Sequence, residues 1–374
     1  MSSPQPKPWA VLLACWCMVL SLPLSGSDKR EVVIQRSDRA AIDARVHEAI
    51  EVAGVLLHEE ALSAHLNGLV ARLVNAPQGT VPPYRIVLIN GSEINAFSLS
   101  DGTVYISLGI FSMIDNDAQL ALLLAHEIAH VRLDHHRRFR YELHERAAGS
   151  VLFGGDTPYN LRVAMSGFSR SLEKEADSCA LRNLIESGYN VWVAKELLST
   201  MYSWLKYKEK GYSSSTATHP KFAERYKTSK KMLEELNVDS TSGMVNKQEY
   251  HEVLQPHMAH IVKLLRQSNS VRELYKMALR KLDDNAPQPE WYYLRGSLLE
   301  HYAPKDSFPV AVYSLTSAFR NDTSNTRSIR DLGWLYLKNG NCDSARICLE
   351  LYLAAAPAAT DGAIVRFYLE LLGE

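Results

Sequence analysis

The chain has 374 residues, of which 46% are apolar, and its 41 basic and 42 acidic side chains give a formal net charge of −1. This length is sufficient for two hydrophobic cores. The even charge balance, without a block of basic residues, argues against a nucleic-acid-binding protein.

Residues 1–27 have the pattern of a secretory signal peptide. After a weakly positive start, an apolar stretch runs from Trp9 to Leu24, and Ser25-Gly26-Ser27 supplies small residues for cleavage before Asp28. An uncleaved anchor and a lipoprotein modified at Cys15 are the alternatives, but Pro23 interrupts the stretch, and hydrophobic residues follow the cysteine where a polar tether is expected. We therefore expect a periplasmic protein, with peripheral association with the outer membrane as an open question.

Removal of the signal peptide leaves three cysteines, Cys179, Cys342 and Cys348. This odd number argues against a disulfide framework. Cys179 lies in an apolar helical segment, so we expect it to pack as a small hydrophobe, with a thiol nucleophile as the alternative.

The elements expected up to residue 242 are mainly helices with two short strands. The helical segments are Ser37–Leu57, Glu59–Val74, Val191–Lys210 and Pro220–Leu236, and the strands are Tyr84–Ile89 and Thr103–Ile106. This order is typical of an α+β domain with a small sheet.

A His-Glu-x-x-His motif, His126-Glu127-Ile128-Ala129-His130, follows the second predicted strand. Its histidines are four residues apart and share one helix face, so both imidazoles can reach one cation, while Glu127 lies beside them as a base. The apolar run Ala118–Ala125 predicts a buried helix, and the polar run Asp134–Arg138 predicts its return to water. A buried helix carries these charges only if something neutralises them. The motif predicts a zinc site.

Catalytic zinc needs a third protein ligand, and Glu173 is the best candidate. It lies in a helical segment that follows Ser169 and runs to Gly188. Glu173 and Asp177 are four residues apart, so one carboxylate can bind the metal while the other supports a ligand histidine. A solvated acidic helix is the alternative, and we expect Glu175 to be a solvated residue of that kind.

The segment from Val238 to Gly243 is the best candidate for a linker, which places a second domain at 243–374. Its last ninety or so residues contain small and bulky residues at the spacing of tetratricopeptide repeats. One copy has Leu332-Gly333, Tyr336, Gly340, Ala345 and Pro357, and an earlier copy has Tyr293–Gly296, Ala311 and Ala318. Because two repeats bury little surface, we expect the helices between Gln248 and Leu282 to stack beneath them.

The zinc-binding motif, the Glu173–Asp177 segment and Asn95-Ala96-Phe97 followed by Gly102 resemble the HtpX/CAAX-prenyl-protease family of zinc metallopeptidases over residues 80–230. The resemblance implies that Glu173 is the third zinc ligand and that Asp177 supports the site. It also implies that Asn95, Ala96 and Phe97 lie on a strand at the edge of the substrate cleft.

Thr218-His219-Pro220, with Arg225 five residues after the proline, is a further family-like element. His219 resembles a histidine that approaches the metal or binds the reacting oxyanion, and an ordinary loop histidine is the alternative. Membrane-spanning family members carry hydrophobic hairpins between the zinc helix and the third ligand. The 42 residues between His130 and Glu173 contain no apolar stretch of that length, so the chain is more similar to periplasmic BepA-like members with tetratricopeptide repeats.

These features predict an endopeptidase of the bacterial cell envelope that cleaves unfolded or misassembled proteins with one zinc ion per chain. Glu127 is the expected base, and the helical repeats are expected to bind protein substrates or envelope assemblies. A chaperone or assembly factor with little or no peptidase activity is the alternative.

Overall fold

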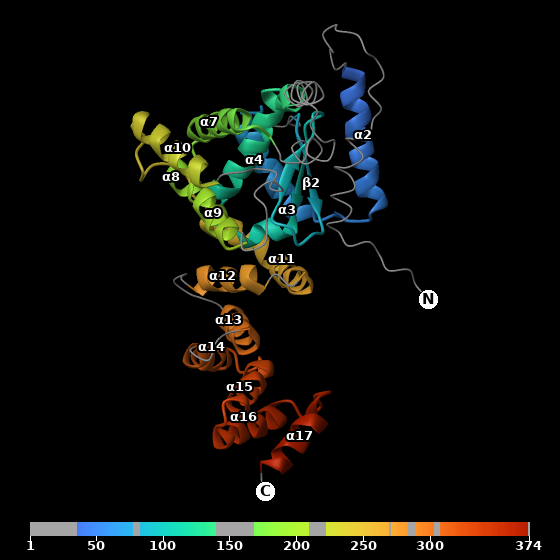
Figure 1. The fold of residues 1–374 in the computed structure, drawn as a ribbon, viewed down its shortest axis with the longest axis vertical. Coiled ribbons are helices and arrows are strands. Elements are labelled where there is room, and N and C mark those ends of the chain that lie inside the picture. The colour runs from blue at the N-terminus through green and yellow to red at the C-terminus, as the bar shows by residue number, and fades with distance from the viewer. Residues whose placement is uncertain are drawn as a thin grey trace, which may run out of the picture. The chain divides into compact units, whose positions relative to one another are not determined.

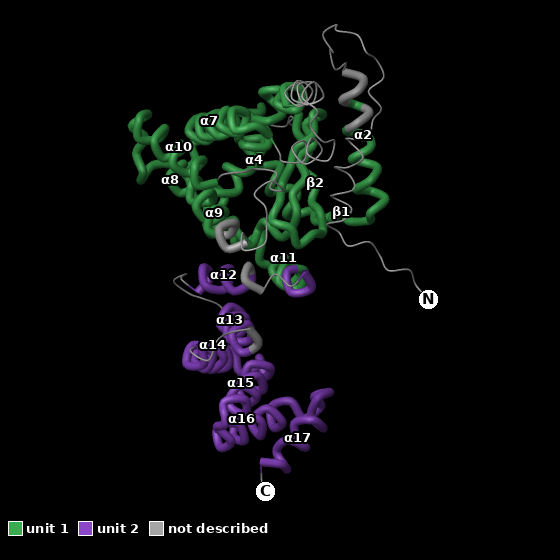
Figure 2. The backbone as a smooth tube through the Cα atoms, in the orientation of Figure 1, with its two compact units in different colours: residues 1–264 green, residues 265–374 purple. Residues whose placement is uncertain are grey.

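The computed structural model describes residues 36–77, 83–139, 168–208, 222–268, 271–282, 289–302 and 307–372. Two compact units, residues 1–264 and residues 265–374, make up the chain (Figure 2). In its described part the first unit combines helices with a small sheet, and the second is helical, as the sequence predicts. The predicted signal peptide lies outside the described residues. Of the helices that are described, none is both long and apolar enough to cross a membrane.

The sheet of the first unit has four strands in the order β1-β2-β4-β3. The strands are β1 (Leu56–Leu57), β2 (Arg85–Ile89), β3 (Ala96–Ser98) and β4 (Thr103–Ser107). β2 runs parallel to β4 with Arg85 opposite Thr103, and β1 and β3 pair antiparallel at the two edges. The two predicted strands are therefore confirmed as β2 and β4. Ala96 and Phe97, which were expected on a strand at the edge of the substrate cleft, lie in the edge strand β3.

The helix predicted for Ser37–Leu57 ends earlier than expected. α2 covers Arg36–Val52, and Gly54 then adopts a φ of 62°. A left-handed glycine turns the chain out of the helix, so that Leu56–Leu57 form β1 instead. On its inner side, α2 buries Val46 and Ile50 against the sheet residues Ile89 and Tyr105.

The central helix of the first unit is α4 (Asp117–Arg132), which lies between the sheet and α7 (Figure 1). Its N-cap Asn116 accepts a hydrogen bond from the backbone N–H of Gln119, and every residue from Asp117 to His130 is buried. α3 (Glu60–Leu73) also packs on it, and His65 contacts the buried Asp117 carboxylate at 2.7 Å. The buried helix predicted from the apolar run is thus confirmed.

The remaining helices in the described part of the first unit are α7 (Arg170–Glu186), α8 (Val191–Ala194), α9 (Glu196–Lys208), α10 (Phe222–Glu235) and α11 (Lys247–Gln267), whose end extends past the unit boundary. α7 ends where Gly188 adopts a φ of 78°, as its predicted stop signal implies. The helix predicted for Val191–Lys210 is divided at Lys195 into α8 and α9.

The segment predicted as a linker is held against α8. The Trp192 indole donates to the Val238 carbonyl at 2.9 Å, and the Asn190 amide donates to the Ser240 carbonyl at 3.0 Å. Further along, the Tyr250 hydroxyl of α11 donates to the Ile114 carbonyl at 3.1 Å. These contacts explain why the division between the units falls after Leu264. The domain boundary at 242/243 stays a prediction.

The second unit contains the helices α12 (Val271–Leu282), α13 (Pro289–Tyr302), α14 (Phe308–Asn321), α15 (Thr326–Lys338), α16 (Cys342–Ala355) and α17 (Gly362–Leu371). α13 packs on α14, and α15 packs on α16. A Cβ added to Gly296 would lie 2.7 Å from Leu315, and one added to Gly333 would lie 2.7 Å from Leu349. Both helix pairs therefore approach closely at a glycine, which supports the predicted repeat.

Candidate metal centre

α4 supplies the two histidines of the candidate site. His126 and His130 are one helical turn apart in a stretch whose burial is fixed by the apolar residues Leu120–Ala125. Their Nε2 atoms lie 3.0 Å apart, and the two side chains are 5% and 0% exposed. Glu127, which follows His126 directly, is also buried, with 1% of its surface exposed.

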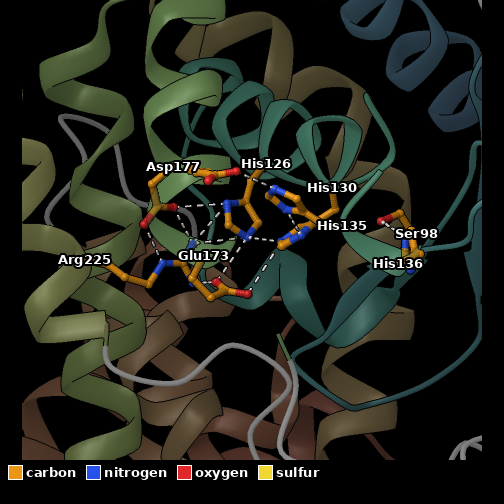
Figure 3. A network of polar contacts seen from close by, with 9 residues as sticks. Ser98, His126, His130, His135, His136, Glu173, Asp177 and Arg225 are labelled. Carbon is orange, nitrogen blue, oxygen red and sulfur yellow. Dashed lines mark hydrogen bonds and ion pairs between the residues drawn. The ribbon is translucent and has the colours of Figure 1, made fainter. Parts of the chain in front are cut away.

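The first turns of α7 supply the carboxylates. Glu173 Oε2 lies 3.4 Å from His126 Nε2, and Glu173 Oε1 lies 3.5 Å from His130 Nε2 (Figure 3). The ligand atoms of these three buried residues all fall within 4.8 Å of one another. Two imidazole nitrogens and a carboxylate oxygen that converge in this way fit the donor set of a catalytic zinc ion. The structure thus brings together the three residues that the sequence proposes as metal ligands.

His126 and Glu173 are also in contact with a buried ion pair. Asp177 Oδ1 lies 3.0 Å from His126 Nδ1, on the side of the ring away from the other ligands. Arg225 from α10 donates two hydrogen bonds to Asp177, at 2.7 and 2.9 Å, and its guanidinium lies 3.3 Å from Glu173 Oε2. Arg225 belongs to the family-like element that begins at Thr218, but no role could be predicted for it from the sequence.

This arrangement shifts two ionisation equilibria. Burial would raise the pKa of Asp177, but the charges of Arg225 and His126 and the hydrogen bonds with both residues together outweigh burial and hold this pKa below its ordinary value. Burial and the charge of Arg225 would lower the pKa of His126, but the hydrogen bonds with Asp177 and Glu173, together with the negative charge of Glu173, raise the pKa to about 9. In the metal-free protein at neutral pH, His126 is therefore protonated.

A second group of polar residues lies behind His130. Its Nδ1 is 3.0 Å from Nδ1 of His135, whose Nε2 contacts Glu175 Oε2 at 3.2 Å. Arg138 donates to both oxygens of Glu175, at 2.5 and 3.0 Å, and these hydrogen bonds lower the pKa of Glu175 to about 2. Burial lowers the pKa of His135 despite the hydrogen bond to Glu175. The prediction that the polar run returns to water is therefore wrong for His135, which is fully buried.

Sequence analysis did not predict that side chains gather behind His130, because His135 was included in a solvated run and Phe168 was not considered. Glu175 was expected to be solvated, and its side chain is exposed. The Phe168 ring stacks on His130 with centroids 3.9 Å apart and an interplanar angle of 13°. Glu175 is exposed by 46% but has two partners. A third histidine five residues after the motif is the one sequence signal that points to this group.

The other predicted site residues have different outcomes. Asn95 precedes β3 and pairs its carbonyl with the Ser107 N–H at 3.1 Å, and the Phe97 ring stacks on Tyr105 at 5.1 Å. Their proposed contact with substrate stays a prediction, as does the role of His219, which lies outside the described residues. Burial raises the pKa of the Cys179 thiol, which disfavours a nucleophilic thiolate.

Comparisons with known proteins agree with this chemistry. Residues 56–155 match the model of Peptidase family M48, and this range includes both histidines. The chain is 29% identical over 184 residues to the beta-barrel assembly-enhancing protease of Escherichia coli (strain K12), and 28% identical over 183 residues to the protein of that name in Yersinia pestis. Each alignment covers 44% of this chain and 37% of the relative. The chain thus contains a segment that is similar to this peptidase family, and the alignments span little more than a third of those relatives.

Proposed function

We propose that this chain, with its domain of peptidase family M48, is a zinc-dependent endopeptidase. One observation carries the proposal. His126, His130 and Glu173 bring their ligand atoms within 4.8 Å of one another in a buried position, and Glu127 is next to the first of them. Three protein ligands of this kind leave a fourth position for water, which is the arrangement of a catalytic rather than a structural zinc site.

Zinc held by His126, His130 and Glu173 would supply Lewis-acid activation of a water molecule and of the scissile carbonyl. Glu127 takes the proton of the attacking water and returns it to the leaving amine. Asp177 accepts the Nδ1–H of His126, so that Nε2 is the nitrogen of that ring that would bind the metal, and Arg225 holds the carboxylate in place. His219 is proposed either to approach the metal or to bind the oxyanion.

We propose unfolded or misassembled proteins of the bacterial cell envelope as substrates. The names of the relatives, which refer to beta-barrel assembly, support this choice, and the signal-peptide pattern supports a periplasmic location. An extended substrate would add its backbone to β3, which is an edge strand of the sheet. The second unit, interpreted as tetratricopeptide repeats, would bind substrate proteins or envelope assemblies.

The test compares wild type with Glu127→Gln on an unfolded protein substrate, with zinc content measured by elemental analysis. Because general acid–base catalysis contributes about 10²- to 10⁴-fold, Glu127→Gln should lose activity by that factor and keep its zinc. Glu186→Gln, on the exposed end of α7, is the matched control and should behave as wild type. His126→Ala and Glu173→Ala should lower zinc affinity by at least the roughly 10- to 100-fold typical of changes around metal ligands.

Two outcomes would count against the proposal. Cleavage by Glu127→Gln near the wild-type rate would exclude Glu127 as the base. A wild-type protein that holds one zinc ion per chain, cleaves nothing and prevents aggregation of the unfolded substrate would favour the chaperone alternative.

A further inference from the structure

The Nδ1 atoms of the two proposed ligand histidines, His126 and His130, have different partners. His126 faces the Asp177 carboxylate with its Nδ1, at 3.0 Å. His130 faces another imidazole, since its Nδ1 lies 3.0 Å from Nδ1 of His135 (Figure 3). Histidines that bind metals usually donate the hydrogen of the second ring nitrogen to an acceptor, which fixes the tautomer and the ring orientation. His135 occupies the place of that acceptor for His130.

The geometry excludes His135 as a metal ligand through this nitrogen. Nε2 of His130 faces the other ligands, 3.0 Å from His126 Nε2 and 3.5 Å from Glu173 Oε1. His135 contacts the other nitrogen of the His130 ring, Nδ1, which faces away from these ligands. When Nε2 gives its lone pair to a metal, the ring hydrogen must be on Nδ1, so Nδ1 of His135 must accept it. The hydrogen of His135 is then on Nε2, where Glu175 Oε2 accepts it at 3.2 Å.

The backbone and the surrounding side chains keep His135 in this position. α4 ends at Arg132, and Asp134, two residues later, adopts a left-handed φ of 52° that turns the chain so that His135 is buried behind His130. The Arg138 guanidinium donates to both oxygens of Glu175, which fixes the carboxylate that orients His135. On the face of the His130 ring, Phe168 stacks with centroids 3.9 Å apart.

We propose that His135 is a positioning residue for the metal ligand His130, whose Nδ1–H it accepts, and that Glu175 and Arg138 fix the tautomer of His135 in which it can do so. The inference rests on the proposed function, because it assigns His130 to the metal. It extends the ligand set by a relay of hydrogen bonds that reaches the protein surface at Glu175, whose side chain is 46% exposed.

The test measures zinc affinity of the full chain by competition with a chromophoric chelator, and records the visible spectrum after cobalt substitution. His135→Leu removes the acceptor at similar side-chain volume and should weaken zinc binding by about 10- to 100-fold, with a changed cobalt spectrum. His135→Asn places an amide oxygen where Nδ1 was and should restore most of the affinity. Glu175→Ala should weaken binding by a smaller factor, because it removes only the group that orients His135.

His136→Leu is the matched control, because this neighbouring histidine contacts Ser98 and Phe168. It should bind zinc as wild type does. If His135→Leu fails to fold, Glu175→Ala tests the same relay from the surface. Wild-type affinity in both His135→Leu and Glu175→Ala would overturn the inference and leave the proposed function intact. Wild-type affinity in His126→Ala, measured in parallel, would overturn both.

Discussion

Replacing Arg225 with leucine should strongly destabilise the metal-free protein. The Arg225 side chain is 9% exposed and contacts two carboxylates, Asp177 at 2.7 Å and Glu173 at 3.3 Å. Glu127 contributes a third buried negative charge that acts on this guanidinium. At neutral pH, Arg225 and the protonated His126 oppose these three charges, so the variant would leave three carboxylates facing a single imidazolium.

Loss of one partner from a buried ion pair costs about 3–5 kcal/mol, because the remaining charge is left without compensation. We expect Arg225→Leu to lower the free energy of unfolding of the first unit by that amount. Zinc would add two positive charges while displacing one proton from His126, so the destabilisation should be smaller when the protein is loaded with zinc.

Hydrogen exchange in peptides from α4 and α7, followed across a urea series, would report this stability for the first unit alone. Arg138→Leu is the matched control, since this guanidinium also contacts both oxygens of one carboxylate but is 40% exposed. Its loss should cost about 0–1 kcal/mol. Equal effects of the two substitutions would refute the reasoning, as would an Arg225→Leu effect that zinc leaves unchanged.

Two further predictions concern protons and helix packing. Because the pKa of His126 is raised from 6.5 to about 9 in the folded, metal-free protein, the stability it contributes should be fully present below pH 6.5 and lost as the pH rises through 9. Zinc must displace this proton, so the apparent dissociation constant measured by calorimetry should fall about tenfold per pH unit from pH 7 to 9, and a flat profile would contradict the assignment. In the second unit, Gly333→Val should cost about 1–3 kcal/mol by overpacking against Leu349, whose side chain lies 2.7 Å from the added Cβ. Gly362→Ala, whose Cβ meets no atom closer than 3.5 Å, should be nearly neutral in the same thermal unfolding experiment, and equal midpoints for the two variants would exclude the close approach.

The sequence was sufficient to predict the α4 part of the site, because its spacing has a direct geometric meaning. A helix places residues four apart on one face, so the positions of His126 and His130 follow from the motif. The carboxylate was harder to predict. Glu173 and Asp177 have the spacing of many solvated acidic helices, and only the family resemblance favoured a ligand, whereas the structure shows both residues buried.

The surroundings of His130, the second histidine of the motif, could not be predicted from the sequence, and the reason differs from that for Glu173. His135 belongs to a polar run, and its burial depends on the left-handed backbone of Asp134, which the sequence does not specify. A comparable local cause, the left-handed Gly54, ended α2 early and turned predicted helical residues into β1. Errors of both kinds arise because hydrophobic periodicity reports which face of an element is apolar, and not where a single backbone angle redirects the chain.

The second and third candidate ligands, His130 and Glu173, are separated along the chain by 42 residues. A metal bound by α4 and α7 closes this segment into a loop, and the entropy lost on closure grows only with the logarithm of loop length. Doubling the segment would therefore cost about 0.6 kcal/mol, less than a typical hydrogen bond contributes. The interval between the second and third ligands is thus a place where evolution can insert or delete whole structural elements while the metal site stays intact.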